Sequence, residues 1–266
     1  TGGSAVTLSA APFVALAHAL AEASATIIRP LFRTTLVVDD KADASPVTVG
    51  DRDAEQAMRA VIRRTFPDHG VIGEEYGADA PEAEFVWILD PIDGTGAFIT
   101  GMPSFGTLIG LCHQGRPILG VLNQPVLGER WIGGTDLPTT FNGQPVRCRP
   151  CPSVARAALY TTAVELFHRP EDAAAFERLR ARAHLRRYGS DCYAYGLVAL
   201  GHADLVCEAG LKLHDYAALA PVVEGAGGCM TDWEGRPLGI GSGDRVLASG
   251  DGAAHADALA LLSGLA

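Results

Sequence analysis

Basic residues are scarce in this chain. Its 266 residues include 21 Lys and Arg against 31 Asp and Glu, which gives a formal net charge of -10 at pH 7. Binding to a nucleic-acid backbone needs a positively charged surface, so this balance excludes nucleic acid as an expected partner. Internal repeats, low-complexity tracts and linkers are also missing. With 48% hydrophobic and 20% charged residues, the composition is typical of one large globular domain or two closely packed halves.

The N-terminal stretch lacks the features of a leader. No Lys or Arg precedes its apolar run, and Thr7, Ser9 and His18 interrupt it, so neither a secretory signal nor a membrane span is expected. The pattern favours an amphipathic helix over residues 12–33, with Pro12 in the first turn, where the missing N–H is tolerated. We therefore expect no association with a membrane.

The six cysteines lack the spacing of a disulfide framework. In a chain of this size we expect them to be reduced thiols of a cytoplasmic protein. Cys148 and Cys151 form one C-x-x-C motif. A zinc site or a redox pair is not favoured, because no second motif of this kind and no paired histidine motif accompanies it.

Apolar periodicity predicts a sheet-rich first half and a second half in which strands and helices alternate. In the first half we expect helices over residues 12–33 and 51–64, strands over residues 35–38, 71–72, 85–89, 107–112, 117–123 and 130–133, and a hairpin turn at Asn142-Gly143. In the second half we expect strands over residues 157–161, 184–188, 203–208 and near Cys229 and Val246, and helices over residues 171–183, 193–200, 214–226 and 253–262.

The most informative segment is the end of the apolar run at residues 85–89. Pro91 cannot donate a ladder hydrogen bond, so we expect the strand to end near Asp90. Hard divalent cations such as Mg²⁺ prefer oxygen ligands, which the carboxylates of Asp90 and Asp93 and the carbonyl of Ile92 can supply. A surface turn is the local alternative, since Asp, Pro and Gly are common turn residues.

The two residues that follow fit an anion. Gly94 lacks a Cβ, and the N–H groups of Gly94 and Thr95 are expected to open a helix, so a phosphate could lie on the backbone beside the cations. Two other segments carry carboxylates that could converge on the same place. Glu74 follows a strand-like run, and Asp215 stands in the expected first turn of a helix.

These motifs resemble the inositol monophosphatase superfamily of Mg²⁺-dependent phosphatases. The resemblance rests on Gly73-Glu74-Glu75, on residues 90–95 and on Asp215 leading into residues 224–228, and it extends from about Lys41 to Gly228. It implies an α+β fold, the layered αβαβα sandwich of the inositol monophosphatases and fructose-1,6-bisphosphatases. It also implies a single phosphatase domain over residues 1–266, with an active site between two packed halves of about 1–150 and 151–266, and a homodimer.

The metal ligands come from the residues themselves, and the resemblance implies the same set. Two Mg²⁺ ions are expected to share Asp90, with Glu74 and the Ile92 carbonyl on the first ion and Asp93 and Asp215 on the second. Asp51 matches the position at which relatives hold a third, weaker ion; the alternative is an N-cap for the helix that follows, with Ala54 as its N3 residue. The residues expected to act in catalysis are Glu74, Asp93 and Thr95, with Thr95 holding the attacking water and Glu74 accepting its proton.

Three further stretches resemble the histidinol-phosphate phosphatase branch, namely residues 98–109, 187–196 and 208–212. The resemblance places Arg187 and Glu208 beside the leaving alcohol. Asp191 could pair with the cationic groups of histidinol, or could simply form a turn. The full set expected to bind substrate is Gly94, Thr95, Arg187, Ser190, Asp191, Glu208 and Asp215.

The implied reaction is hydrolysis of L-histidinol phosphate to L-histidinol and phosphate, a step of histidine biosynthesis. Alternatives are an inositol 1-phosphate or other sugar-phosphate phosphatase, a 3'-phosphoadenosine nucleotide phosphatase, and a regulator that only binds a phosphorylated ligand. The chain departs from the family pattern at two positions. His214 stands where relatives commonly have Trp, and Gly96 stands where they often have Lys, Arg or Thr. We do not expect His214 to be a metal ligand.

Overall fold

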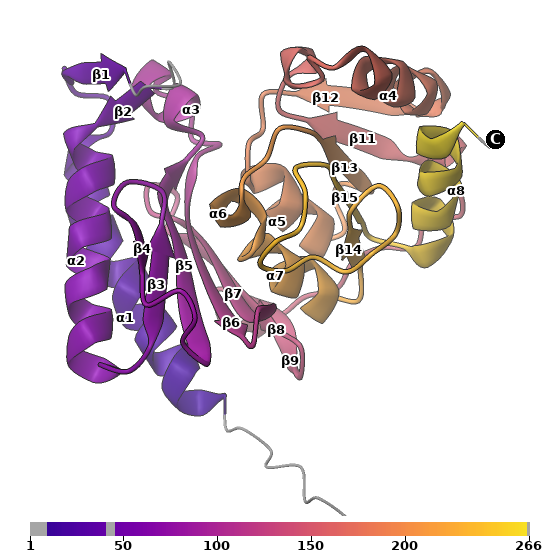
Figure 1. Ribbon diagram of the computed structural model, residues 1–266. Helices are drawn as coiled ribbons and strands as arrows, with labels where there is room; N and C mark the ends of the chain where they lie inside the picture. The colour runs from indigo at the N-terminus through magenta and orange to yellow at the C-terminus, as the bar shows by residue number, and fades with distance from the viewer. Residues whose placement is uncertain (1–9, 41–45, 265–266) are drawn as a thin grey trace, which may run out of the picture.

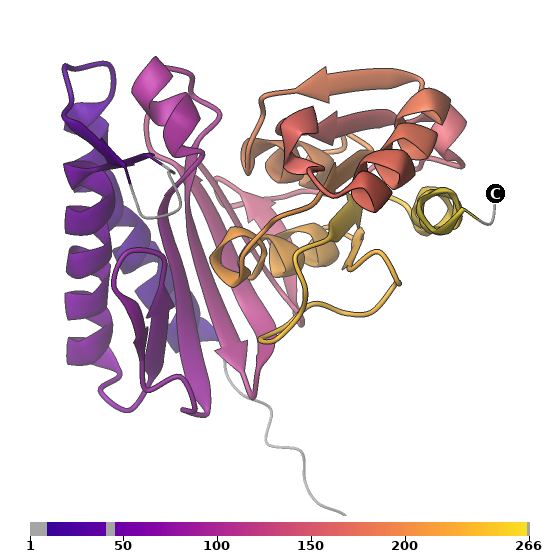
Figure 2. The same cartoon turned by 45° about the horizontal axis from the view of Figure 1, so that its top comes forward.

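The computed structural model describes residues 10–40 and 46–264 and has five layers (Figure 1). An outer pair of helices, a large mixed sheet, a middle layer of short helices, a smaller sheet and a second outer pair of helices follow one another. This is the αβαβα sandwich that the resemblance implied. Figure 2 shows the same order from another angle, with the middle helices between the two sheets.

The first outer layer consists of α1 (Ala11–Ile28) and α2 (Val49–Thr65), with a 3₁₀ turn (Arg29–Leu31) after α1. By length and composition, residues Ala11–Leu31 could also cross a membrane. In the structure, the apolar side of α1 is buried in the core, where Phe13, Leu16 and Leu20 lie with side chains of α2 and the sheet. This packing is that of a core helix, as expected from the sequence.

The large sheet has eight strands, and most of its neighbours are antiparallel. Among the described strands of this sheet, only β3 and β5 pair in parallel. The hairpin turn expected at Asn142-Gly143 joins β9 and β10, and both turn residues have positive φ, as a tight two-residue turn requires. The spatial order is β10 (Gln144–Pro145), β9 (Leu137–Phe141), β8 (Glu129–Gly134), β7 (Arg116–Gln124), β6 (Gly106–His113), β5 (Phe85–Asp93), β3 (Gly70–Gly73) and β4 (Gly77–Asp79).

Two small elements lie beside α2. The strands β1 (Val38–Asp40) and β2 (Pro46–Thr48) form a separate antiparallel pair, so the first strand begins later than the expected residues 35–38. The short helix α3 (Thr95–Thr100) follows β5 directly.

The middle layer consists of α5 (Tyr193–Ala199), α6 (Leu213–Tyr216) and α7 (Leu219–Gly225). One continuous helix over residues 214–226 was expected, and this prediction is wrong. Pro221 has no N–H to donate to the carbonyl of Ala217, and its ring crowds that carbonyl, so the helix is interrupted between α6 and α7. The break lies close against the large sheet, where a Cβ on Gly120 would come within 1.8 Å of the Ala218 carbonyl oxygen.

The second sheet and its outer helices come from the second half of the chain. Strands β11, β12 and β13 are mutually parallel where they pair, and β15 runs antiparallel to both β13 and β14. The order is β12 (Leu185–Tyr188), β11 (Ala158–Thr161), β13 (Leu205–Glu208), β15 (Val246–Ser249) and β14 (Cys229–Thr231), covered by α4 (Pro170–Arg182) and α8 (Gly252–Ser263).

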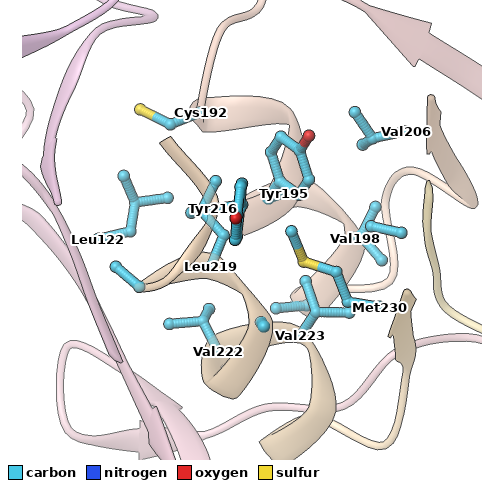
Figure 3. Packing of buried hydrophobic residues seen from close by; sticks show 14 of the residues in the cluster. Leu122, Cys192, Tyr195, Val198, Val206, Tyr216, Leu219, Val222, Val223 and Met230 are labelled. Atoms are coloured by element: carbon cyan, nitrogen blue, oxygen red, sulfur yellow. The ribbon is translucent and has the colours of Figure 1, made fainter. Parts of the chain in front are cut away.

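The largest buried cluster joins the middle layer to both sheets. Figure 3 shows Tyr195 and Val198 from α5 beside Val222 from α7, with Leu122 from β7 and Val206 from β13 on either side. Burying side chains of this size stabilises the fold by about 1.5 to 3 kcal/mol each. The two sheets are therefore held in a fixed relation by the helices that also carry Asp215.

Candidate metal and phosphate site

The candidate site lies at one end of the large sheet, where three segments meet. Glu74 directly follows β3, and its N–H donates to the Leu89 carbonyl at 3.1 Å. Asp90 and Asp93 belong to β5, and Asp215 stands on α6, which contacts β5 across the boundary between the halves (Figure 1). The structure therefore brings together the three segments that the sequence predicted to converge.

An irregularity in β5 turns its two aspartates toward the same place. The strand was expected to end near Asp90, but it continues through Pro91 to Asp93. Asp90 pairs with Leu108 and Asp93 with Gly106, so three steps on β5 match two on β6, as in a β-bulge. In a regular strand, side chains at i and i+3 point to opposite faces, and the extra residue removes this opposition. The bulge also accommodates Pro91, which cannot donate to a regular ladder.

The carboxylates form two overlapping groups. One oxygen each from Asp90, Asp93 and Asp215 lie within 4.8 Å of one another. A second group joins Glu74 and Asp90 to a ring nitrogen of His214 at the same spacing. Asp90 belongs to both groups, in agreement with the expectation that it is the shared ligand.

The electrostatics of this cluster favour a cation. Asp90 is 2% exposed, and its Oδ1 has no hydrogen-bond partner among the described residues. Burial raises the pKa of Asp90 well above its ordinary value, and the neighbouring charges of Glu74, Asp93 and Asp215 raise it further. The pKa of Asp93 is raised in the same way by burial and then by Asp215 and Asp191. An orphaned carboxylate oxygen within a group of acids fits a divalent ion, which supplies the missing partner and charge.

Thr95 and Asp51 lie beside this cluster. The Thr95 hydroxyl donates to the Ile92 carbonyl at 3.0 Å and approaches Asp51 Oδ1 at 3.4 Å. Asp51 is fully buried, and burial is the main cause that raises its pKa. Its expected alternative role as a helix N-cap is wrong, because Thr48 is the N-cap and Asp51 is the N3 residue of the same capping box, accepting from the Thr48 N–H at 2.8 Å. A metal-binding role for Asp51 stays a prediction.

The second half of the chain contributes the segment at Asp191 and Cys192. The Cys192 N–H donates to Asp93 Oδ2 at 2.8 Å, so a backbone amide from one half orients a carboxylate of the other. Asp191 accepts a hydrogen bond from the Ser104 hydroxyl at 2.9 Å, and its pKa is raised by burial. Its side chain also lies where a Cβ of Gly94 would be, at 2.8 Å from Cγ, which explains the glycine at that position.

Glu208 is buried at the end of β13. It accepts from the Thr162 N–H at 2.9 Å and from the Tyr195 hydroxyl at 2.7 Å, and burial raises its pKa. A cavity of about 420 Å³ extends from the acidic cluster to this residue. Its lining includes Glu74, Asp93, Asp215, Asp191, Glu208 and His214.

Arg187 and Ser190 are placed differently. Arg187 is exposed on β12, the edge strand of the second sheet, opposite Tyr160 of β11. Neither Arg187 nor the half-buried Ser190 lines the cavity just described. Their roles in substrate binding stay predictions.

Glu55 supports the turn after Glu74, and this role was not predicted from the sequence. The fully buried carboxylate of Glu55 on α2 accepts from the N–H of Glu75 at 2.7 Å and of Tyr76 at 3.2 Å, and it pairs with Arg59 at 2.7 Å. A Cβ on Gly73 would lie 2.0 Å from Glu55 Oε1, so the glycine before Glu74 makes room for this carboxylate. The i, i+4 spacing of Glu55 and Arg59 on an expected helix was the feature of the sequence that could have indicated this ion pair.

The geometry agrees with comparisons to known proteins. A model of the inositol monophosphatase family matches residues 9–265. The chain belongs to the inositol monophosphatase family. It is accordingly a metal-dependent phosphoric monoester hydrolase, and members of this family use divalent metal ions.

Relatives within the inositol monophosphatase family carry more than one substrate name. The chain is 47% identical over 256 residues to the chloroplastic bifunctional phosphatase IMPL2 of Arabidopsis thaliana, covering 93% of this chain and 74% of the relative. It is 38% identical over 226 residues to a histidinol-phosphatase of Chlorobaculum parvum, covering 85% and 87%. A solved structure of an inositol monophosphatase from Zymomonas mobilis is 50% identical, with a TM-score of 0.89, covering 96% of this chain and 99% of that one.

Proposed function

We propose that this phosphatase hydrolyses L-histidinol phosphate to L-histidinol and phosphate, with Mg²⁺ as its cofactor, and serves histidine biosynthesis. The observation that supports this choice is the half-buried Asp191 and the buried Glu208, two acids that line the same cavity as Asp93 and Asp215. Histidinol carries an amine and an imidazole, and carboxylates bind such cationic groups through charge-assisted hydrogen bonds. Several relatives named histidinol-phosphatase support the same choice.

In this proposal, Asp90, Asp93, Asp215 and Glu74 hold two Mg²⁺ ions, together with the Ile92 carbonyl, and Asp51 supports a third. When bound, these ions neutralise the phosphoryl oxygens and lower the pKa of water. Thr95 hydrogen-bonds the attacking water, and Glu74 accepts its proton. The backbone at Gly94 and Thr95 receives the phosphate.

The alcohol of the substrate extends toward the second half. Asp191 receives a cationic group of histidinol, and Glu208 is held in place by Tyr195 for a second contact. Arg187 and Ser190 are proposed to act at the entrance, since both precede Asp191 within a few residues. We also propose that the protein forms a homodimer in the cytoplasm. A measurement of its mass in solution tests the oligomeric state.

Inositol 1-phosphate is the second candidate substrate. It is supported by the Zymomonas mobilis inositol monophosphatase, which is 50% identical to this chain, and by the Arabidopsis relative, which is named a bifunctional phosphatase. A panel of phosphomonoesters assayed with Mg²⁺ distinguishes the two. We expect kcat/KM for histidinol phosphate to exceed that for inositol 1-phosphate by at least about tenfold, or 1.4 kcal/mol. Equal or reversed values would contradict the proposal.

The variant Asp191→Asn tests the carboxylate directly. We expect it to raise the KM for histidinol phosphate by about tenfold or more, because a charge-assisted contact contributes about 1.5 to 3 kcal/mol, and to change the KM for inositol 1-phosphate much less. The matched control is Ser104→Ala, which removes the 2.9 Å hydrogen bond to Asp191 but keeps the carboxylate. Equal losses in both variants, or equal losses with both substrates, would contradict the assigned role.

A further inference from the structure

His214 is a titratable residue of the cavity to which the mechanism above gives no role. It stands on α6 directly before Asp215, and its side chain is 12% exposed. Its Nε2 lies 3.5 Å from Asp215 Oδ1. One of its ring nitrogens, one oxygen of Glu74 and one oxygen of Asp90 all lie within 4.8 Å of one another.

A second observation indicates that this group faces a ligand. Asp90 Oδ1 is buried and has no hydrogen-bond partner among residues 10–40 and 46–264. Leaving such an oxygen unsatisfied costs about 1 to 3 kcal/mol, or more for a charged group, so native structures rarely tolerate it unless an ion or ligand completes the site. Asp90 is common to both acidic groups, so the residue that carries the orphaned oxygen also belongs to the group that contains His214.

The spacing of the three ligand atoms suits a single ion. Donors about 2.1 Å from one cation lie at most about 4.2 Å apart, so a spread within 4.8 Å needs only a small rotation of the side chains. An imidazole beside carboxylates is a mixed nitrogen and oxygen set. Such a set favours Mn²⁺, Co²⁺ or Zn²⁺ over Mg²⁺, which prefers oxygen ligands alone.

We propose that the His214 imidazole is a metal ligand of this chain, acting with Glu74 and Asp90 on one divalent ion, and that it raises the affinity of the site for transition-metal ions. This inference rests on the metal site of the proposed function and reverses the expectation drawn from the sequence. The alternative is that His214 serves only as a partner of the neighbouring Asp215 carboxylate.

The test loads the full-length chain with Mn²⁺ and records pulsed electron paramagnetic resonance, which detects coupling of the ion to a ligating nitrogen. We expect nitrogen coupling in the wild type, with the change that ¹⁵N-labelled histidine must produce, and its loss in His214→Gln. The matched control is His202→Gln, at an exposed histidine of the loop before β13. This control should keep the coupling.

Calorimetric titration gives a second readout. The affinity for Mn²⁺ should fall at least about tenfold in His214→Gln, since even outer partners of metal ligands contribute this much, whereas the affinity for Mg²⁺ should change much less. Absence of nitrogen coupling in the wild type, or equal Mn²⁺ affinities in wild type and variant, would overturn the inference. The wild-type spectrum decides even if the variant does not fold.

These outcomes are separate from those of the substrate panel. Nitrogen coupling together with failure to hydrolyse histidinol phosphate would support the His214 inference and contradict the proposed substrate. Efficient histidinol phosphate hydrolysis without nitrogen coupling would do the opposite.

Discussion

Two sets of buried or half-buried aspartates in this molecule differ in the residues that surround them. In the second half, Asp172, Asp204 and Asp232 each have an arginine within hydrogen-bond distance. Arg149 holds Asp204 through two contacts of 2.6 Å, Arg236 lies 2.6 Å from Asp232, and Arg169 lies 2.5 Å from Asp172. At the candidate site, no arginine of the described part of the chain forms an ion pair with Asp90, Asp93 or Asp215.

The aspartates of the candidate site have raised pKa values. Burial and mutual repulsion raise the pKa values of Asp90 and Asp93 well above the ordinary range, and burial raises that of Asp215. Repulsion among acids that no arginine neutralises destabilises the folded chain in the absence of a counter-ion. The chain therefore neutralises its structural acids with its own arginines, whereas the acids of the site are available to an external cation.

The largest expected effect is on turnover in Asp90→Asn. Because Asp90 is the residue shared by both acidic groups, we expect kcat to fall by at least about a thousandfold, equivalent to about 4 kcal/mol. Steady-state kinetics with Mg²⁺ measures this loss, with circular dichroism as the check on folding. A folded variant that retains near-normal turnover would contradict the role of these aspartates in holding the cations.

The next effect is on stability in Asp204→Asn. This substitution leaves the partly exposed Arg149 without its carboxylate and weakens the 2.7 Å bond from the Ala158 N–H, so the free energy of unfolding should fall by about 1.5 to 3 kcal/mol. Urea denaturation measures the change. Turnover per folded molecule should stay unchanged, and a selective loss of activity would show that the two sets are not distinct.

A smaller effect concerns His255, a buried titratable group of the second half. It contacts the hydroxyls of Thr231 at 2.8 Å and Ser249 at 2.9 Å, and burial lowers its pKa from 6.5 to about 4. Between these values the unfolded chain binds a proton that the folded chain does not, so stability falls as the pH falls from about 6.5 to about 4. Relative to His255→Gln, the wild type should lose about 2 kcal/mol between pH 7 and pH 5.

Urea denaturation of both proteins across this pH range measures the difference. Parallel stability curves for wild type and variant would contradict the assigned pKa. This dependence of stability on pH is opposite in sign to that expected from the acids at the site. Their raised pKa values make the metal-free fold less stable as the pH rises above the ordinary aspartate range, so the two regions can be told apart by the sign of the slope.

The sequence predicted the layers and the positions of the acids that gather at the candidate site because both depend on contiguous patterns. Alternating strands and helices indicate layered sheets, and Glu74, Asp90, Asp93 and Asp215 each stand at an end of a recognisable element. The bulge in β5 depends on its register with β6, which no local pattern encodes. The prediction that the strand ends near Asp90 failed for this reason.

One other feature needed contacts distant in sequence. Glu55 supports the turn after Glu74 from a helix about 20 residues earlier, and its partners are backbone N–H groups, which have no residue type to recognise. The assignment of Asp51 as an N-cap failed by three positions, because Thr48 is a capping residue of the same kind and precedes it. The break before Pro221 could have been predicted from the proline itself.

The most direct test of the central claim is the thermal unfolding of the metal-free chain titrated with Mg²⁺, in wild type and Asp90→Asn. We expect the wild type to gain about 2.7 kcal/mol at a hundredfold excess of Mg²⁺ over its Kd. Metal-free Asp90→Asn should start more stable than the metal-free wild type and gain much less from Mg²⁺. A wild type whose stability does not change with Mg²⁺, or a metal-free variant less stable than the wild type, would contradict the claim that these acids are left without arginine partners for a cation.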